Sequence, residues 1–162
     1  MSVRIVPGSG AATVATGLPV LDHLLALLAR AGRFDLTLEL APADAEAEVA
    51  EAGRALGEAL APLLRTAEAT GHGSAVVPAD EALAQVALEA SERSLVASNV
   101  DLSAARAGGL RSDLAARFLK SLATAAGLTL HVRLIDGEDS QHVLEAIFKA
   151  LGAALADATR QS

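Results

Sequence analysis

The chain contains no cysteine, no tryptophan and no tyrosine among its 162 residues. Without cysteine, disulfide bonds, thiolate nucleophiles and cysteine-ligated zinc are all excluded. Aromatic residues account for only 2% of the sequence, so the core must consist mainly of alanine, leucine and valine. Such small side chains let helices and strands approach closely, but each buries little apolar area. Oligomerisation would add buried area to a domain of this composition.

An excess of positive charge is missing as well. The formal net charge is −7 and no cluster of lysine and arginine stands out, so a nucleic-acid-binding surface is not expected. Nowhere do 18 apolar residues follow one another, and the N-terminal segment MSVRIVPGSG lacks the apolar core of a signal peptide. We therefore expect a soluble, cytoplasmic protein that binds neither nucleic acid nor membrane.

What the sequence does have is the composition of a globular protein. Hydrophobic residues make up 52% of the chain and charged residues 20%, which excludes a disordered protein. The length fits a single domain, residues 1–162, with a core of its own. Strands are predicted at 3–7, 11–15, 34–40, 71–80 (with a turn), 83–91, 94–101 and 128–134, and helices at 18–32, 45–67, 112–126 and from 139 onward.

Two pairs of segments repeat at nearly the same spacing. RALGEAL (54–60) and KALGAAL (149–155) match at an offset of 95, and the alternating segments FDLTLEL (34–40) and LTLHVRL (128–134) match at an offset of 94. Any two amphipathic helices rich in alanine and leucine look alike, but agreement in order and spacing favours a duplication. We predict an α+β fold made of two strand-helix-strand-helix halves, with sheets backed by helices. The two halves span about residues 1–70 and 71–162.

One segment has the spacing of a ligand pair or an acid–base pair. In DSQHVLEAIFKALGAAL (139–155), His142 and Glu145 are three residues apart, so on a helix both project from nearly the same face. The residue that would complete a histidine pair is Gln141. A metal site, the remnant of one, and a solvated first helix turn all fit this pattern, since a helix N-terminus also favours glutamate.

Three longer segments carry a specific resemblance. They are TGLPVLDHLLALLARAGRFDLTLEL (16–40), VVPADEALAQVALEASERSLV (76–96) and FLKSLATAAGLTLHVRLIDGEDSQHVLEAIFKALGAAL (118–155). In this order they resemble the patterns TGxxFLDHMLxxxxxHGxFDLxxxA, YVPMDEALxxxxxDLSGRPxL and FFxxLxxxxGxTLHxxxxxGxNxHHxxExxFKAxxxAL of imidazoleglycerol-phosphate dehydratase, the hydro-lyase of histidine biosynthesis. The resemblance implies the fold of that family (ribosomal protein S5 domain 2-like).

The resemblance also implies paired Mn²⁺ ions bound between subunits. Such ions would act as Lewis acids that stabilise charge on the imidazole ring of the substrate, and imidazole and carboxylate ligands suit Mn²⁺. The family further implies trimers joined into a 24-subunit cage. A group of arginine, serine and lysine residues anchors the phosphate of the substrate.

Several ligand positions of the family hold other residues in this chain. The histidine of the LDH pattern is kept as His23, and the second HHxxE motif keeps His142 and Glu145 but has Gln141. The histidine of the EHFF pattern is replaced by Arg117, which places a permanent cation at a ligand position. The first HHxxE motif falls on Glu46, Ala47 and Ala50. The metal candidates implied by the resemblance are His23, His142, Glu145 and Glu46, although His23 also fits a polar residue beside an apolar helix stripe.

The phosphate-binding group is thinner than in the family. Arg93 matches the arginine of SGRP and Lys149 matches the lysine of FKA, whereas Gly71 stands where the family has an arginine. We expect Arg93 and Lys149 to line a shared pocket for a phosphate-bearing small molecule, although an isolated arginine also fits an ion-pair partner. Asp80 and Glu81 match the MDE of the family, and we interpret them as capping residues.

Three functions are compatible with this set of residues. The first is an active imidazoleglycerol-phosphate dehydratase, which needs two metal ions per site. The second, which we favour, is a diverged paralogue with weak or no dehydratase activity that keeps the fold for binding or assembly. The third is an altered enzyme that holds one metal ion for a related reaction. For the favoured function we expect no Mn²⁺ or one weakly bound metal ion, and a trimer rather than a 24-mer.

Overall fold

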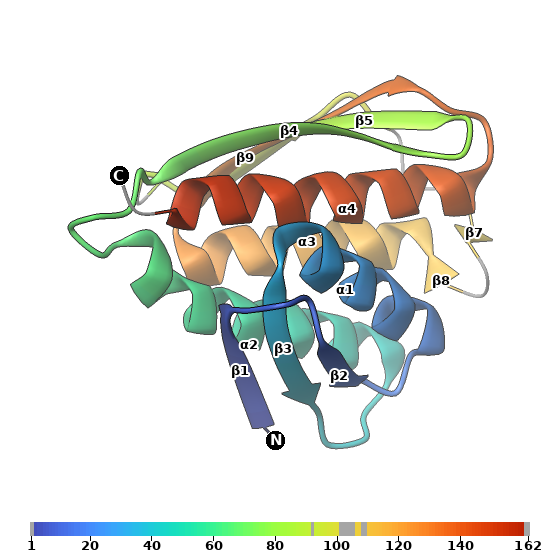
Figure 1. The fold of residues 1–162 in the computed structure, drawn as a ribbon. Coiled ribbons are helices and arrows are strands. Elements are labelled where there is room, and N and C mark those ends of the chain that lie inside the picture. Colours follow the sequence, from blue (N-terminus) through green and yellow to red (C-terminus); the bar gives the residue numbers. More distant parts are fainter. Residues whose placement is uncertain (1, 92, 101–105, 108–109, 161–162) are drawn as a thin grey trace.

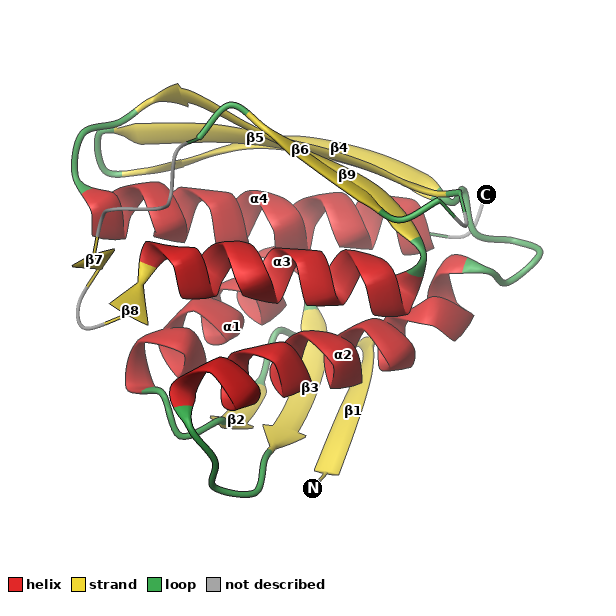
Figure 2. Cartoon of the chain, turned by 180° about the vertical axis from the view of Figure 1, so that it is seen from behind, coloured by secondary structure: helices red, strands yellow, loops and turns green. Residues whose placement is uncertain are grey.

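The computed structural model describes residues 2–91, 93–100, 106–107 and 110–160. Its elements are β1 (Ser2–Pro7), β2 (Ala12–Ala15), α1 (Pro19–Gly32), β3 (Phe34–Glu39), α2 (Ala45–Leu64), β4 (His72–Ala79), β5 (Ala82–Ala90), β6 (Leu95–Ser98), β7 (Arg106–Ala107), β8 (Leu110–Arg111), α3 (Ser112–Ala126), β9 (Leu128–Asp136) and α4 (Ser140–Thr159). Two sheets enclose two layers of helices: α3 and α4 against one sheet, α1 and α2 against the other (Figures 1 and 2). The α+β fold predicted from the sequence is confirmed.

A few boundaries differ from the prediction. The two-residue strands β7 and β8 were not predicted, because they are too short for a periodic pattern. The helix α2 ends at Leu64, near Pro62, and the amide of Arg65 donates to the carbonyl of Pro62 in a tighter turn. The predicted loop around residues 108–109 and the last residue of the strand predicted at 94–101 lie outside the described part of the chain.

Each of the two larger sheets combines antiparallel pairs with one parallel pair. In the three-stranded sheet, of order β1-β3-β2, β1 is antiparallel and β2 is parallel to β3. In the four-stranded sheet, of order β4-β5-β9-β6, only β6 pairs in parallel, with β9. Alternate side chains of β3, of β5 and of the first part of β9 are buried against the helices, as the period of two predicted. Each sheet therefore buries one face and leaves the other uncovered by helices (Figure 1).

The helices pair across the two layers, α1 with α4 and α2 with α3, and all four begin at the same end of the molecule (Figure 1). Glycines allow each pair to approach closely. A Cβ atom on Gly152 would lie 2.1 Å from the carbonyl oxygen of Leu28, and one on Gly57 would lie 2.8 Å from the carbonyl oxygen of Leu122. These two contacts recur at the sequence offsets of 95 and 94. The recurrence supports the duplication inferred from the sequence.

The core lies between the two sheets and consists mostly of leucine and alanine, as the composition requires. Phe118 of α3 and Phe148 of α4 stack at its centre, with ring centroids 5.5 Å apart. Such a pair stabilises the fold beyond the apolar area that it buries. Within the described residues, no helix is both long enough and apolar enough to cross a membrane.

A carboxylate organises the loop between β1 and β2. The backbone amides of Ser9 and Ala11 donate to Oδ1 of Asp35 at 3.0 and 3.2 Å. These backbone hydrogen bonds lower the pKa of Asp35 below its ordinary value. A Cβ atom on Gly8 would collide with the same carboxylate, so the loop sequence PGSG leaves room for it. Asp35 therefore holds β1 and β2 on either side of β3.

Replacing Asp35 with Asn should lower the melting temperature at neutral pH, and the loss should disappear in acid. The folded-state pKa of Asp35 is depressed, so its contribution is complete above the ordinary pKa and is lost as the pH falls through the folded value. Thermal unfolding of both proteins from about pH 7 to about pH 3 measures this difference. Glu39→Gln, an exposed neighbour on β3, is the matched control, and an equal loss for Asp35→Asn at every pH would contradict the prediction.

Candidate functional site

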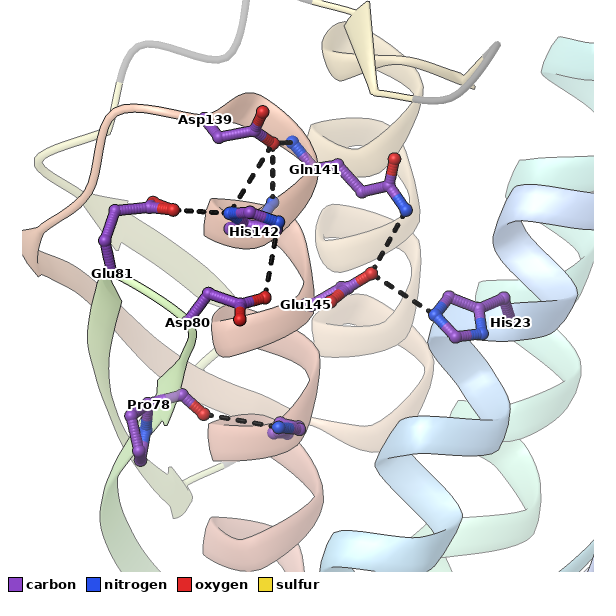
Figure 3. Close-up of polar contacts among 9 residues, drawn as sticks. His23, Pro78, Asp80, Glu81, Asp139, Gln141, His142 and Glu145 are labelled. Carbon is purple, nitrogen blue, oxygen red and sulfur yellow. Dashed lines mark hydrogen bonds and ion pairs between the residues drawn. The ribbon is translucent and has the colours of Figure 1, made fainter.

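Two of the predicted ligands meet at the N-terminal ends of α1 and α4. Because these helices run side by side in the same direction, His23 and Glu145 face each other, with Nε2 and Oε2 3.3 Å apart (Figure 3). Gln141, one helix turn before Glu145, donates from Nε2 to the same carboxylate oxygen at 3.2 Å. The side chain of Gln141 therefore competes for the oxygen that a metal ion would need.

His142 points away from this group toward the turn between β4 and β5 (Figure 3). Its Nδ1 contacts Oε1 of Glu81, and its Nε2 lies 3.3 Å from Oδ2 of Asp80. Asp139, the N-cap of α4, lies 4.0 Å from Nδ1 and accepts hydrogen bonds from the amides of Gln141 and His142. The interpretation of Asp80 and Glu81 as capping residues is wrong, because both carboxylates contact His142 and the N-cap of α4 is Asp139.

The carboxylates around His142 favour its protonated form. The hydrogen bond with Glu81 raises the pKa of His142 above its ordinary value, and the negative charges of Asp139 and Asp80 act in the same direction. The same contact lowers the pKa of Glu81. A protonated imidazole has no lone pair to offer, so a metal ion would first have to displace this proton.

The fourth predicted ligand, Glu46, belongs to the other pair of helices. It lies in the first turn of α2, where α2 and α3 form an open groove of about 570 Å³. Ala47, Ala50 and Arg117 line this groove together with Lys120. Arg117 lies opposite Ala50 as His23 lies opposite Glu145, so the two pairs of helices place equivalent residues at equivalent points. Only the α1–α4 pair presents an imidazole beside a carboxylate.

Within one chain, the candidate ligands do not gather around a common point. His23 and Glu145 supply one nitrogen and one carboxylate, Gln141 already binds that carboxylate, and His142 is held by acids elsewhere. At the equivalent α2–α3 position there are two alanines and an arginine. No group of three or more His, Asp or Glu side chains suited to a metal ion occurs in the part of the chain that the structure describes.

Arg93 and Lys149 are not brought together within one chain. Nζ of Lys149 donates to the carbonyl oxygen of Pro78 at 3.3 Å, and Pro78 pairs with Leu83 at one end of β5. Arg93 follows the other end of β5 and is exposed. Lys149 is therefore held near residue 83, whereas Arg93 follows residue 90. At ~3.3 Å per residue, these two ends of β5 are roughly 25 Å apart. A pocket that uses both residues would therefore need two subunits.

Sequence reasoning did not place three of the residues that shape this site. Gln141 was seen as a missing histidine, yet it lies four residues before Glu145, a spacing that allows a side-chain hydrogen bond on a helix. Asp80 and Glu81 are about 60 residues from His142 in sequence, so only the fold could bring them together. The one feature of the sequence that could have indicated a role for Asp80 and Glu81 is their position in the turn between two predicted strands.

Comparisons with known proteins agree with this architecture. A family model described as imidazoleglycerol-phosphate dehydratase matches residues 16–155. The chain belongs to the imidazoleglycerol-phosphate dehydratase family. The dehydratase of Acetivibrio thermocellus is 38% identical over 165 aligned positions, covering 99% of this chain and 84% of that protein. The dehydratase of Syntrophobacter fumaroxidans is 42% identical and covers 99% and 83%, respectively.

Solved dehydratase structures share the whole fold. The enzyme of Staphylococcus aureus superposes with a TM-score of 0.90 at 28% identity, covering 99% of this chain and 93% of that one. The enzyme of Pyrococcus furiosus in complex with (S)-C348 gives 0.88 at 30% identity, covering 99% and 89%. The family assignment made from the sequence is confirmed. The imidazoleglycerol-phosphate dehydratase family is one of metal-dependent, oligomeric lyases of histidine biosynthesis.

Proposed function

We propose that this chain is a diverged member of the imidazoleglycerol-phosphate dehydratase family with weak or no dehydratase activity, which keeps the fold for binding or assembly. The proposal rests mainly on the hydrogen-bond partners of Glu145. Its carboxylate is bound by Gln141 and His23 rather than left open toward a second histidine of the same helix. The corresponding position in the first half is Ala50, which has no donor atom at all.

The electrostatic demands of the reaction support this proposal. Removing a weakly acidic proton beside an imidazole ring requires fixed positive charge at the ring, and one lost electrostatic contact of this kind typically costs about 3 kcal/mol. In this chain several ligand positions of the family hold other residues, namely Ala47, Ala50, Arg117 and Gln141. Residues that act as a unit lose most of their joint effect when any of them is removed.

A phosphate-bearing small molecule is the ligand class that we propose for the retained cations. Lys149 is only partly buried, and its ammonium group is held by a single backbone carbonyl, so it can still meet an anion. Arg93 is exposed, and an arginine binds phosphate in a fixed, two-pronged geometry. Because the two residues are distant within one chain, the pocket would combine Arg93 and Lys149 of different subunits.

A single-metal enzyme with an altered substrate is the second candidate. The 3.3 Å contact between His23 and Glu145 favours it, because one imidazole and one carboxylate are adjacent and can rotate toward a shared ion. This candidate requires Gln141 to release Glu145.

Manganese binding separates these functions. We expect fewer than one Mn²⁺ ion per chain when the purified protein is titrated by calorimetry and its metal content is measured after dialysis. Two ions per chain, held tightly, would show that the protein keeps the metal site of an active dehydratase. One ion that is lost in both His23→Ala and Glu145→Gln would support the single-metal enzyme. His131→Ala removes an exposed imidazole from the far side of the four-stranded sheet and is the matched control.

We propose a trimer as the basic oligomer of the chain, in place of a 24-mer. Apolar surface supports association without metal: Val76, Leu95 and Ile135 of the four-stranded sheet are each about half exposed, at 52%, 46% and 54%. Burying such side chains between copies would stabilise an oligomer. The ligands that would link trimers through metal ions are largely replaced.

A further inference from the structure

An open cavity of about 650 Å³ lies where α1, α2 and α4 end, opposite the end at which all four helices begin (Figure 1). The end of β1, the start of β3 and the last turns of the three helices form its walls. Its volume is within the range of about 300–1,000 Å³ that is typical of small-molecule sites. None of the candidate metal or phosphate ligands lines it. We call it the helix-end cavity and define it by Pro7, Arg33, Phe34, Leu63, Ala156 and Arg160.

The apolar side chains of the helix-end cavity come from four different elements: Pro7 of β1, Phe34 of β3, Leu63 of α2 and Ala156 of α4. Phe34 is only 1% exposed, and its ring packs so closely on Gly32 that an added Cβ there would lie 2.6 Å away. The apolar part of the wall is therefore held in place by the core. Such a surface suits an apolar ring or chain of a ligand.

Two arginines bring positive charge to the same cavity. Arg33 is exposed, and its guanidinium makes no hydrogen bond or ion pair with any residue that the structure describes. Arg160 contacts Asp157 but remains 68% exposed, so it keeps donors for a ligand. The carbonyl groups at the end of α4 already accept hydrogen bonds from Thr70 and Gly71 and do not occupy these donors. Arginine binds carboxylate and phosphate groups in a bidentate manner.

The backbone of Arg33 has a conformation that an arginine does not favour. Its φ of 54° and ψ of 47° lie in the left-handed region, at the C-cap of α1, where glycine or asparagine is the usual residue. The backbone amide of Arg33 donates to the carbonyls of Ala29 and Arg30, so the helix end is capped without the guanidinium. An unfavourable backbone conformation together with an unpaired head group indicates a function for the side chain rather than for the fold.

We propose that the helix-end cavity binds an amphipathic organic anion, a molecule in which an aromatic or aliphatic group carries a carboxylate or a phosphate. The apolar group packs against Phe34, Leu63 and Ala156. The anionic group binds Arg33 and Arg160. This site goes beyond the proposed function, because it lies at the other end of the helices from His23 and Glu145 and does not depend on dehydratase activity.

Titration with naphthoate tests the site in the full-length protein. The chain has neither tryptophan nor tyrosine, so the fluorescence of the probe is measured without emission from such residues. We expect saturable binding, at least ~10-fold tighter than that of the uncharged naphthalenemethanol, because the alcohol cannot form charge-assisted hydrogen bonds. Inorganic phosphate alone should bind more weakly than naphthoate, since it has no apolar group. Equal affinities for the acid and the alcohol would overturn the proposal.

Two variants test the two parts of the cavity. Arg33→Gly removes the cation and relieves the left-handed conformation, so naphthoate should bind at least ~10-fold more weakly although the melting temperature of the free protein does not fall. Ala156→Leu fills part of the cavity and should weaken the binding of naphthoate and of the alcohol alike. Arg133→Gln removes an exposed arginine from the outer face of β9 and is the matched control. Undiminished naphthoate binding by folded Arg33→Gly protein would refute the site.

Lys149→Gln separates this cavity from the phosphate-binding pocket proposed above. Naphthoate binding should be unchanged in this variant, because Lys149 does not line the helix-end cavity. Binding that is lost in Lys149→Gln and retained in Arg33→Gly would place the anion in the pocket of Arg93 and Lys149. That result would overturn the present inference and leave the proposed function standing.

Discussion

A histidine auxotroph that lacks the dehydratase should not grow without histidine when it expresses this chain. The replaced positions lie at the two equivalent points of the fold: Ala47, Ala50 and Arg117 between α2 and α3, and Gln141 beside Glu145. Removing one preorganised electrostatic contact slows an enzyme about 10²- to 10³-fold, and several lost members of one site cost more. We expect kcat/KM to be lower than that of an intact dehydratase by at least about 10³-fold.

Restoring the replaced positions provides the positive control. A variant with Glu46→His, Ala47→His, Ala50→Glu, Arg117→His and Gln141→His should bind Mn²⁺ more tightly than the natural chain, because neutral imidazoles and carboxylates are suitable ligands. Any gain in activity should follow, not precede, the gain in metal binding. Growth of the auxotroph with the unmodified chain would contradict the proposed loss of activity, whatever the restored variant does.

The secondary structure was predictable because its signals are local. The alternation in residues 34–40 and 128–134 and the apolar periodicity of the helices depend on neighbours within a few residues, and the corresponding strands and helices form. The duplicated spacing also indicated which residues would be equivalent. His23 and Glu145, identified by their family motifs, do meet across α1 and α4.

The orientation of individual side chains was not predictable in the same way. His142 and Glu145 are three residues apart, which separates their directions by about 60° around the helix axis. That difference is enough for Glu145 to reach His23 on α1 while His142 reaches Glu81 beyond β4. Arg93 and Lys149 were expected to share a pocket. Their separation depends on the packing of α4 beside β4, which places Lys149 at Pro78 and which no local pattern encodes.

Replacing Gly152 with Ala should destabilise the protein and loosen the candidate site together. The added Cβ would lie 2.1 Å from the carbonyl oxygen of Leu28, which is a backbone atom, so no change of rotamer can relieve the collision. The helices α1 and α4 would have to separate. Overpacking of this kind costs about 1–3 kcal/mol or more, and the better helix propensity of alanine offsets up to about 1 kcal/mol. Each net kcal/mol corresponds to a fall of about 2–4 °C in melting temperature for a chain of this size.

Gly57 offers a graded comparison within the same molecule, because it occupies the equivalent place between α2 and α3. Its added Cβ would lie 2.8 Å from the carbonyl oxygen of Leu122, so Gly57→Ala requires a smaller displacement and should cost less. The two variants should also differ at the site. Separation of α1 from α4 in Gly152→Ala moves His23 away from Glu145, which a shift of the His23 imidazole signals in an NMR spectrum would report. In Gly57→Ala those signals should stay in place, since the α1–α4 contact is untouched. Equal melting temperatures for the two variants, or unmoved His23 signals in Gly152→Ala, would show that the helix pairs tolerate the methyl group by another route.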